Sequence, residues 1–270
     1  MIGTCVARPR QTEAPNYQVR ALHRGIAVLE SLAAVGTGLT LGELSSQVAM
    51  PKATAFRILE CLRQEGLVTR EGETGRYKLG IRLFELGCAY LAASPLQETA
   101  TPFLRRLVEN TRQTANLSVL DGHHVLHLAV IEPETIALHY HTRIGAREPF
   151  YCTALGKVLA AHLRDGDLAN LVASAELRAR TPASITDRTA LLKELAEVRR
   201  LGYAEDREEM IPGLRCIAAP VRDSTGEVVA AISISGPASE LGGEHRERFL
   251  PILLATTRSV SERLGWVARD

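Results

Sequence analysis

Four side chains suited to nucleic-acid recognition lie close together in the sequence: Lys52, Thr54, Phe56 and Arg57. Arginine forms paired hydrogen bonds with guanine, lysine and threonine hold phosphates, and phenylalanine contacts the thymine methyl group. Apolar residues recur at helical spacing in the same segment, at Ala55, Ile58, Leu59 and Leu62. The four side chains therefore lie off the buried face of a predicted helix, although each alone is more often an ordinary solvated residue.

The elements around this helix indicate how it is positioned. A helix over residues 22–33 comes first, and a second begins at Thr40, where Thr40 and Glu43 form a predicted capping box. Pro51 then begins the third helix after a short break, and this helix ends at Gly66. Strands follow over residues 67–70 and 76–79, joined by a turn. Three helices and a hairpin predict a winged helix-turn-helix.

The predicted hairpin has three basic side chains, Arg70, Arg76 and Lys78. They could hold the DNA backbone or enter a minor groove. The alternative is that they keep an exposed hairpin edge soluble.

The rest of the chain predicts a second domain. We expect a flexible arm over residues 1–18, the winged helix-turn-helix over 19–80, a linker helix over 81–95 and a larger domain over 96–270. In the larger domain, strands at 116–120, 125–131, 136–142, 216–222 and 228–235 alternate with helices at 97–112, 154–163, 187–201 and beyond Phe249. This order predicts the α+β class, with a largely antiparallel sheet.

Two features of the larger domain suit a polar ligand. Thr153 can cap the helix that starts at Ala154, which leaves the first backbone N–H groups, including that of Leu155, free to hold an anion. Ser233 and Ser235 alternate along a strand, so their hydroxyls share one face. Two hydroxyls on one face of a sheet predict the floor of a polar pocket.

Asp206 is placed just before a predicted strand, and two roles for it are equally open. Its carboxylate could accept a hydrogen bond from a ligand hydroxyl. It could equally cap a loop, as aspartate commonly does.

Other reactive side chains lack the neighbouring ligands or bases that metal binding or catalysis would require. His139 and His141 could face the same way, with His127 nearby, but a metal site needs three or four converging ligands and none lies at a matching spacing. Cys152 and Cys216 have no base paired with them in any sequence signature. The glycine-rich phosphate loops and the nucleophile elbow are absent. We therefore expect no metal, no cofactor and no catalysis.

Composition sets wider limits. The chain of 270 residues is 46% hydrophobic and 23% charged, as in a globular protein, and its net charge is only +1. Residues 20–83 nevertheless carry nine Lys or Arg against six Glu, a modest basic excess. The longest apolar run, 228–234, is too short to span a bilayer, and no secretory signal opens the chain. We expect a cytoplasmic protein with no membrane partner.

Runs of residues in both domains resemble the IclR family of bacterial transcriptional regulators. In the first domain these are residues 21–29 (ALHRGIAVL), 51–59 (PKATAFRIL) and 76–80 (RYKLG). In the second they are, in the family's order, 153–157 (TALGK), 202–209 (GYAEDREE), 213–219 (GLRCIAA) and 231–237 (AISISGP).

The resemblance implies a ligand-responsive regulator, a repressor in our interpretation. It implies a GAF-like effector domain that binds a small organic acid, a double-stranded DNA operator, and a homo-oligomer that is a dimer or a dimer of dimers. By matching position, the effector site would be lined by Ala154, Leu155, Gly156, Asp206, Cys216, Ser233 and Ser235. Phe150 and Tyr151 would tune which acid fits.

Two other functions stay open at this stage. A metabolic enzyme could use Cys152 or Cys216 as a nucleophile, with the helical domain serving assembly. A protein-interaction adaptor could carry a winged helix that no longer binds DNA.

Overall fold

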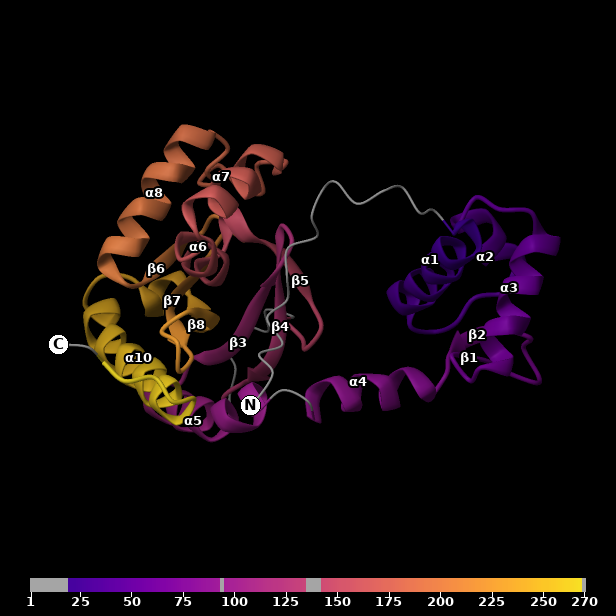
Figure 1. Ribbon diagram of the computed structural model, residues 1–270, viewed down its shortest axis with the longest axis horizontal. Helices are drawn as coiled ribbons and strands as arrows, with labels where there is room; N and C mark the ends of the chain where they lie inside the picture. The colour runs from indigo at the N-terminus through magenta and orange to yellow at the C-terminus, as the bar shows by residue number, and fades with distance from the viewer. Residues whose placement is uncertain (1–18, 93–94, 135–141, 269–270) are drawn as a thin grey trace. The chain divides into compact units, whose positions relative to one another are not determined.

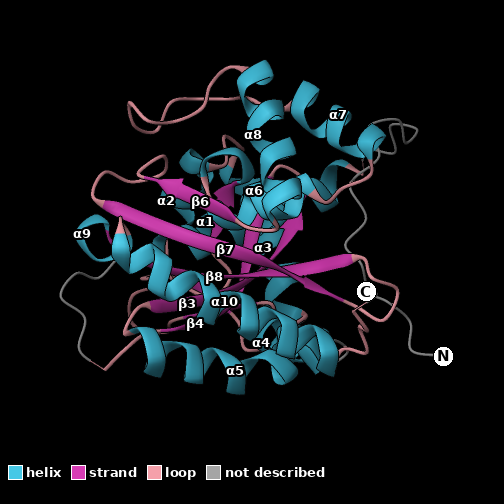
Figure 2. Ribbon diagram, turned by 90° about the vertical axis from the view of Figure 1, so that its left-hand side faces the viewer, coloured by secondary structure: helices cyan, strands magenta, loops and turns pink. Residues whose placement is uncertain are grey.

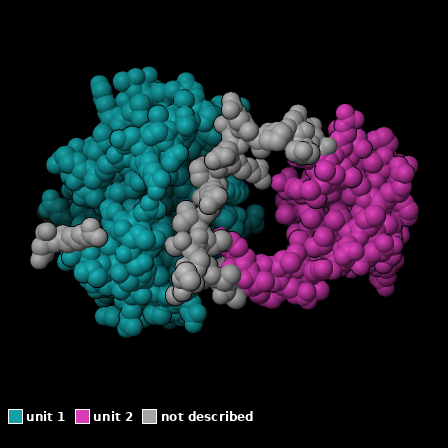
Figure 3. Space-filling model, in the orientation of Figure 1, with its two compact units in different colours: residues 1–10, 95–270 teal, residues 11–94 magenta. Residues whose placement is uncertain are grey.

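The computed structural model describes residues 19–92, 95–134 and 142–268. These residues form two compact units that divide between positions 94 and 95 (Figure 3). Each unit has its own hydrophobic core. None of the helices in the described ranges is long and apolar enough to cross a membrane.

The first unit along the chain, which is labelled unit 2 in Figure 3, contains three helices, a hairpin and a fourth helix (Figure 1). Its elements are α1 (Arg20–Val35), α2 (Leu41–Gln47), α3 (Lys52–Gln64), β1 (Val68–Arg70), β2 (Tyr77–Leu79) and α4 (Arg82–Ala92). The predicted capping box is present: the Glu43 N–H donates to Thr40 Oγ1 at 3.3 Å, and the Thr40 N–H donates to Glu43 Oε2 at 2.7 Å. Val28, Leu44 and Leu59 meet in the core. The predicted winged helix-turn-helix arrangement is thus found.

The second unit is built on one six-stranded sheet. Its order is β5 (Arg147–Pro149), β4 (His124–Ile131), β3 (Thr114–Asp121), β8 (Val228–Pro237), β7 (Leu214–Arg222) and β6 (Ala204–Arg207). Every neighbouring pair of these strands is antiparallel. The α+β class and the antiparallel sheet are therefore as predicted.

Helices cover both faces of this sheet (Figure 2). On one face lie α5 (Pro95–Thr111) and α10 (Glu244–Arg263), which pack on aliphatic side chains such as Ile232 and Ile234. On the other face lies α6 (Ala154–Ala161), which contacts β3, β7 and β8 and is covered in turn by α8 (Arg188–Leu201). The alternation of β8 sends Ser233 to the α6 face, as its sequence predicted.

Several short elements were not predicted. These are β5, the 3-10 turn Phe150–Cys152, α7 (Asp165–Ser174), α9 (Ala238–Leu241) and β6. We expected Asp206 to precede a strand, but it lies within β6, opposite Cys216 on β7. The sequence of β6, Ala-Glu-Asp-Arg, has little apolar alternation, and pairing with β7 defines it. The strand predicted over 136–142 falls almost wholly outside the described residues.

Gly156 allows α6 to approach the chain that precedes it. A Cβ atom built on Gly156 would lie 2.2 Å from the carbonyl oxygen of Phe150 and 2.4 Å from its Cα atom. Both contacts are with backbone, which cannot turn aside as a side chain can. The first turn of α6 can therefore pack against the 3-10 turn only because Gly156 has no side chain.

We expect Gly156→Ala to lower the free energy of unfolding by about 3 kcal/mol or more, because the added methyl group forces α6 away from the 3-10 turn. Chemical denaturation measures this change. Gly166→Ala on α7 is the matched control, since a Cβ there meets nothing within 4 Å. Equal stability of the two variants would contradict the close approach.

Candidate functional site

Helix α3 presents the predicted recognition side chains to solvent. Lys52, Phe56 and Arg57 are exposed and Thr54 is half-buried, whereas Ala55 and Leu59 on the opposite side are fully buried. Phe56 keeps 44% of its surface exposed, an unusual state for a phenylalanine. An exposed aromatic ring beside two free cations is typical of a nucleic-acid interface.

The three basic residues of the hairpin have partners within their own unit. Arg76 donates to the Gly38 carbonyl oxygen at 2.8 Å and pairs with Glu43 at 3.2 Å, while Lys78 pairs with Glu71 at 3.0 Å. The guanidinium of Arg70 lies 5.5 Å from the centre of the Tyr77 ring. Arg76 thus ties the hairpin to the start of α2, a structural role that the sequence did not indicate.

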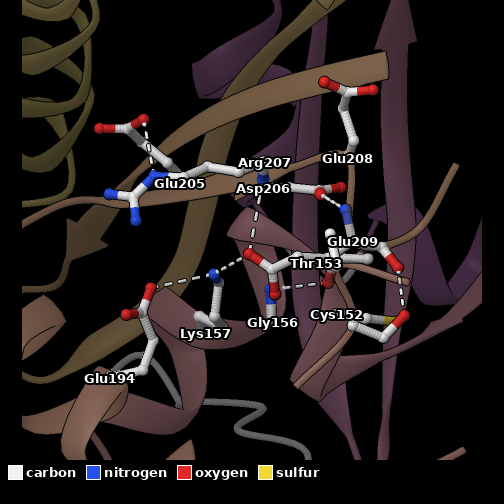
Figure 4. Close-up of polar contacts among 12 residues, drawn as sticks. Cys152, Thr153, Gly156, Lys157, Glu194, Glu205, Asp206, Arg207, Glu208 and Glu209 are labelled. Carbon is white, nitrogen blue, oxygen red and sulfur yellow. Dashed lines mark hydrogen bonds and ion pairs between the residues drawn. The ribbon is translucent and has the colours of Figure 1, made fainter. Parts of the chain in front are cut away.

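The start of α6 has the predicted cap. Thr153 Oγ1 accepts from the Gly156 N–H at 3.1 Å and donates to the Pro149 carbonyl oxygen at 3.2 Å (Figure 4). Within the described part of the chain, the N–H groups of Ala154 and Leu155 have no acceptor. Both residues are buried. Two unpaired N–H donors at a helix N-terminus can hold one carboxylate group.

The two predicted serines lie beside this helix and share a partner. The side-chain amide of Asn116, on β3, donates to Ser233 Oγ at 3.2 Å and to Ser235 Oγ at 3.0 Å. Asn116 is buried, and its Oδ1 atom has no hydrogen-bond partner. Sequence reasoning missed Asn116; the strand alternation of residues 114–120 was the one signal that could have placed it on this face.

Asp206 caps the turn that follows β6. Its Oδ1 atom accepts from the Glu209 N–H at 2.7 Å (Figure 4). Burial raises the pKa of the Asp206 carboxyl to about 7; the Glu209 N–H opposes this shift and the Glu209 charge adds to it. A large fraction of Asp206 is therefore neutral near pH 7, and a neutral carboxyl can donate a hydrogen bond to an anion.

Lys157 carries a fully buried ammonium group on α6. Its Nζ atom lies 2.6 Å from Glu209 Oε1 and 3.0 Å from Glu194 Oε1 on α8 (Figure 4). Glu209 is 5% exposed at the side chain and leaves its Oε2 atom without a partner. The ion pairs join α6 to α8 and to the turn after β6.

The two cysteines near the site are poor nucleophiles. Burial, with a contribution from the Asp206 charge, raises the pKa of Cys152 to about 12 and holds the pKa of Cys216 well above its usual value. Only the thiolate form attacks. These protonated thiols argue against the enzyme alternative.

Phe150 and Tyr151 lie in the 3-10 turn just before α6 and are both buried. The Tyr151 hydroxyl donates to the Arg178 carbonyl oxygen at 2.8 Å and accepts from the Arg178 N–H at 3.0 Å. The ring of Phe150 meets that of Tyr151 edge to face. Both rings pack into the core beside α6, next to Val125 and Leu155.

His127 belongs to a second buried polar group on the α6 face of the sheet. Its Nδ1 atom lies 3.0 Å from Ser118 Oγ, and its Nε2 atom lies 3.2 Å from Glu148 Oε2 on β5. His139 and His141 lie outside the described residues. Where the structure is described, no three metal-binding side chains gather.

Together these side chains form a polar row across all six strands. In strand order the row consists of Glu148 (β5), His127 (β4), Ser118 and Asn116 (β3), Ser233 and Ser235 (β8), Cys216 (β7) and Asp206 (β6). The predicted residues Asp206, Cys216, Ser235 and Ser233 make up one half of the polar row. The other half was not predicted as a unit.

We expect Asp206→Asn to gain stability relative to the wild type as pH rises. Because the pKa of Asp206 rises from 3.8 on folding, its neutral form stabilises the fold, and that contribution is lost as pH increases toward 7. Asparagine keeps the Oδ1 acceptor but cannot ionise. The difference in unfolding free energy should grow by roughly 2 to 3 kcal/mol between pH 5 and 8.

Urea denaturation at several pH values measures this difference. Asp167→Asn on α7 is the control, because Asp167 is exposed. A difference that stays constant with pH would show that Asp206 titrates as an ordinary carboxyl group.

We expect Lys157→Met to cost about 3 to 5 kcal/mol of unfolding free energy, because it leaves two carboxylates without their cation. Adding Glu209→Gln to that variant should recover part of the loss, since it removes the more buried charge. Lys193→Met on α8, where the lysine is exposed, is the control. If Lys157→Met were as stable as the control, the ion pairs would not hold α6.

Two family models match the chain. The model of the IclR helix-turn-helix domain matches residues 21–72, and that of the bacterial transcriptional regulator IclR C-terminal region matches residues 88–262. The second model alone spans more than half of the chain.

Characterised relatives agree with these matches. The chain is 37% identical to the HTH-type transcriptional regulator BhcR of Paracoccus denitrificans, over 90% of this chain and 86% of BhcR. It is 32% identical to the HTH-type transcriptional repressor AllR of Escherichia coli, over 96% of this chain and 95% of AllR.

Solved structures show the same fold. A homologue of IclR from Microbacterium hydrocarbonoxydans, complexed with 4-hydroxybenzoate, superposes with a TM-score of 0.79 at 28% identity and covers 90% of this chain and 98% of its own. The Thermotoga maritima IclR has a TM-score of 0.74 at 28% identity, over 92% and 100% of the two chains. The fold, the polar row and the matches in both units lead to one conclusion: the chain belongs to the IclR family of bacterial transcriptional regulators.

Proposed function

We propose that this protein is a ligand-responsive transcriptional repressor. Residues 19–80 bind a double-stranded operator, residues 96–270 bind a small organic acid, and the helix within residues 81–95 transmits the change between them. A ligand controls DNA binding only if it binds the two states of the protein with different affinity. A protein that binds the bacterial chromosome acts in the cytoplasm.

The exposed surface of α3 is the observation that carries DNA binding. Arg57 and Lys52 make no ion pair within the described residues, in contrast to Arg63 at the other end of α3, which pairs with Glu60 at 2.9 Å. A free guanidinium near the start of a recognition helix is available for the edge of a guanine. Repression is supported by AllR, a relative named as a repressor.

The start of α6 supports an acid as the effector. The N–H groups of Ala154 and Leu155 lie at the positive end of the helix, and a neutral Asp206 adds a possible donor on the same face. The homologue from Microbacterium hydrocarbonoxydans holds 4-hydroxybenzoate, an aromatic acid. Gly156, Cys216, Ser233 and Ser235 complete the proposed site.

Exposed apolar side chains in the first unit support a homo-oligomer, a dimer or a dimer of dimers. Ile81, just before α4, and Phe84, on α4, are 73% and 68% exposed, and on α1, Leu22 and Ile26 are also exposed. Such apolar surface is costly in water and is typically covered by a partner. A second copy of the chain is the natural partner, because a twofold dimer matches a palindromic operator.

We propose no catalytic role. Among the described residues, the protonated Cys152 and Cys216 thiols have no base within hydrogen-bonding distance, and the hydrogen-bond partners of Cys152 there are Met210 Sδ and the Pro149 carbonyl oxygen. The named relatives are regulators.

We expect Arg57→Ala to weaken operator binding by tenfold or more, because one bidentate contact with guanine is lost, while the melting temperature stays within about 2 °C of the wild type. The operator is first selected from random duplexes with the full-length protein, and binding is then measured by fluorescence anisotropy.

Arg63→Ala is the matched control on the same helix, and its affinity should change less than threefold. Unchanged operator affinity in Arg57→Ala would remove α3 as the recognition helix. Lack of any selected sequence would favour the adaptor alternative over DNA binding.

A further inference from the structure

The half of the polar row on β3, β4 and β5 contains hydrogen-bond acceptors that lack donors. Asn116 Oδ1 is buried and has no hydrogen-bond partner among the residues that the structure describes. Glu148 uses Oε2 to bond His127, and its Oε1 atom has no donor among the described residues. A buried acceptor without a donor costs free energy, on the order of 1 to 3 kcal/mol. Asn116 Oδ1 is thus a costly unpaired acceptor, whereas Glu148 Oε1, on a side chain that is 22% exposed, is a charged acceptor open to an incoming donor.

Glu148 is held in place by the two residues behind it. His127 is 2% exposed and lies between Glu148 and the fully buried Ser118, so the carboxylate is fixed at one oxygen. Glu148 itself keeps 22% of its side chain exposed. The second oxygen can thus be reached by a small molecule without disturbing His127.

The charge of Glu148 acts on two thiols at the proposed effector site. It contributes to the raised pKa of Cys216 and of Cys152, the residue just before the α6 cap. Asn116 bonds Ser233 and Ser235, two residues of the proposed site. Asn116 therefore borders the place where the acid would bind, and Glu148 lies on the same face of the sheet, beyond His127.

The two ends of the polar row suit different chemical groups. The α6 end offers N–H donors, which match a carboxylate. The β3 and β5 end offers acceptors, which reject a second carboxylate and match a hydroxyl. An unsubstituted acid satisfies only the first end.

We propose that the effector is an organic acid that also carries a hydroxyl group, and that Glu148 accepts the one hydrogen bond that this hydroxyl can donate. This inference rests on the proposed function of the α6 site. It makes Glu148 a specificity-determining residue. Asn116, which holds Ser233 and Ser235, and His127, which holds Glu148, are positioning residues.

Matched pairs of acids test the proposal on the full-length protein. The pairs are glycolate and acetate, glycerate and propionate, and 4-hydroxybenzoate and benzoate, with binding followed by thermal shift and calorimetry. For the pair that fits the site, we expect about tenfold or greater preference for the hydroxy acid, the usual effect of a hydrogen bond to a charged acceptor.

Glu148→Leu should reduce that preference to less than about threefold. The affinity for the deoxy acid should stay equal or rise, because a negative charge is removed near its carboxylate. Glu148→Gln, which keeps an oxygen acceptor, should retain part of the preference. Glu132→Leu is the control: Glu132 is exposed at the end of β4, and its loss should leave the preference unchanged.

Asn116→Ala and His127→Phe extend the test. Asn116→Ala should weaken the binding of both acids of a pair and leave the preference unchanged, because it removes the donor that holds Ser233 and Ser235. His127→Phe should lower the preference less than Glu148→Leu does, since it only frees the carboxylate to move. Thermal unfolding of each variant shows whether it is folded, and Glu148→Leu carries the test if Asn116→Ala is not.

The outcomes separate this inference from the function on which it rests. Equal binding of hydroxy and deoxy acids, or a preference that survives in Glu148→Leu, overturns the inference and leaves acid sensing intact. If no acid of any pair binds, the proposed effector class fails and the inference fails with it.

Discussion

The buried ammonium of Lys157 is the interaction on which the proposed effector site depends. It joins three segments that are far apart in the sequence, namely α6, α8 through Glu194, and the turn after β6 through Glu209. A buried cation costs several kcal/mol unless its partners are placed well, so those partners cannot drift. Glu209 is further held by Thr181 and Ser184, whose hydroxyls donate to its carbonyl oxygen at 3.2 and 2.7 Å. The start of α6 is thereby fixed against Asp206.

The same ion pairs explain how an anion can bind among acidic side chains. Asp206, Glu209 and Glu148 all act electrostatically on the thiols of this site, and alone they would repel a carboxylate. Lys157 neutralises part of the charge of Glu209, and burial keeps much of Asp206 neutral near pH 7. The dipole of α6 then provides the attraction. The backbone N–H groups at the start of α6 are suited to this acidic surrounding, because they attract an anion without adding a titratable cation.

Local chemistry explains what could be predicted from the sequence. The capping box of Thr40 and Glu43 depends on residues three apart, and the shared face of Ser233 and Ser235 depends on strand alternation, so both could be inferred. The hydrogen bonds of Asn116 with these serines could not be inferred from the sequence, because they join positions more than a hundred residues apart. Strand β6 was missed for the same reason: its residues form a strand by pairing with β7, and their own pattern does not require one.

The family resemblance has a similar limit, and the polar row shows why. The matching motifs supply α6, Asp206, Cys216, Ser233 and Ser235, which together suit the acid group that organic acids share. A group common to all the ligands cannot distinguish one acid from another. We therefore propose that discrimination comes from residues outside the motifs, and on this sheet face Asn116, His127 and Glu148 lie outside them. The hydrogen bond between His127 and Glu148 forms only when β4 and β5 are aligned in the sheet, because the two residues lie on different strands. The sequence of either strand alone does not indicate this alignment.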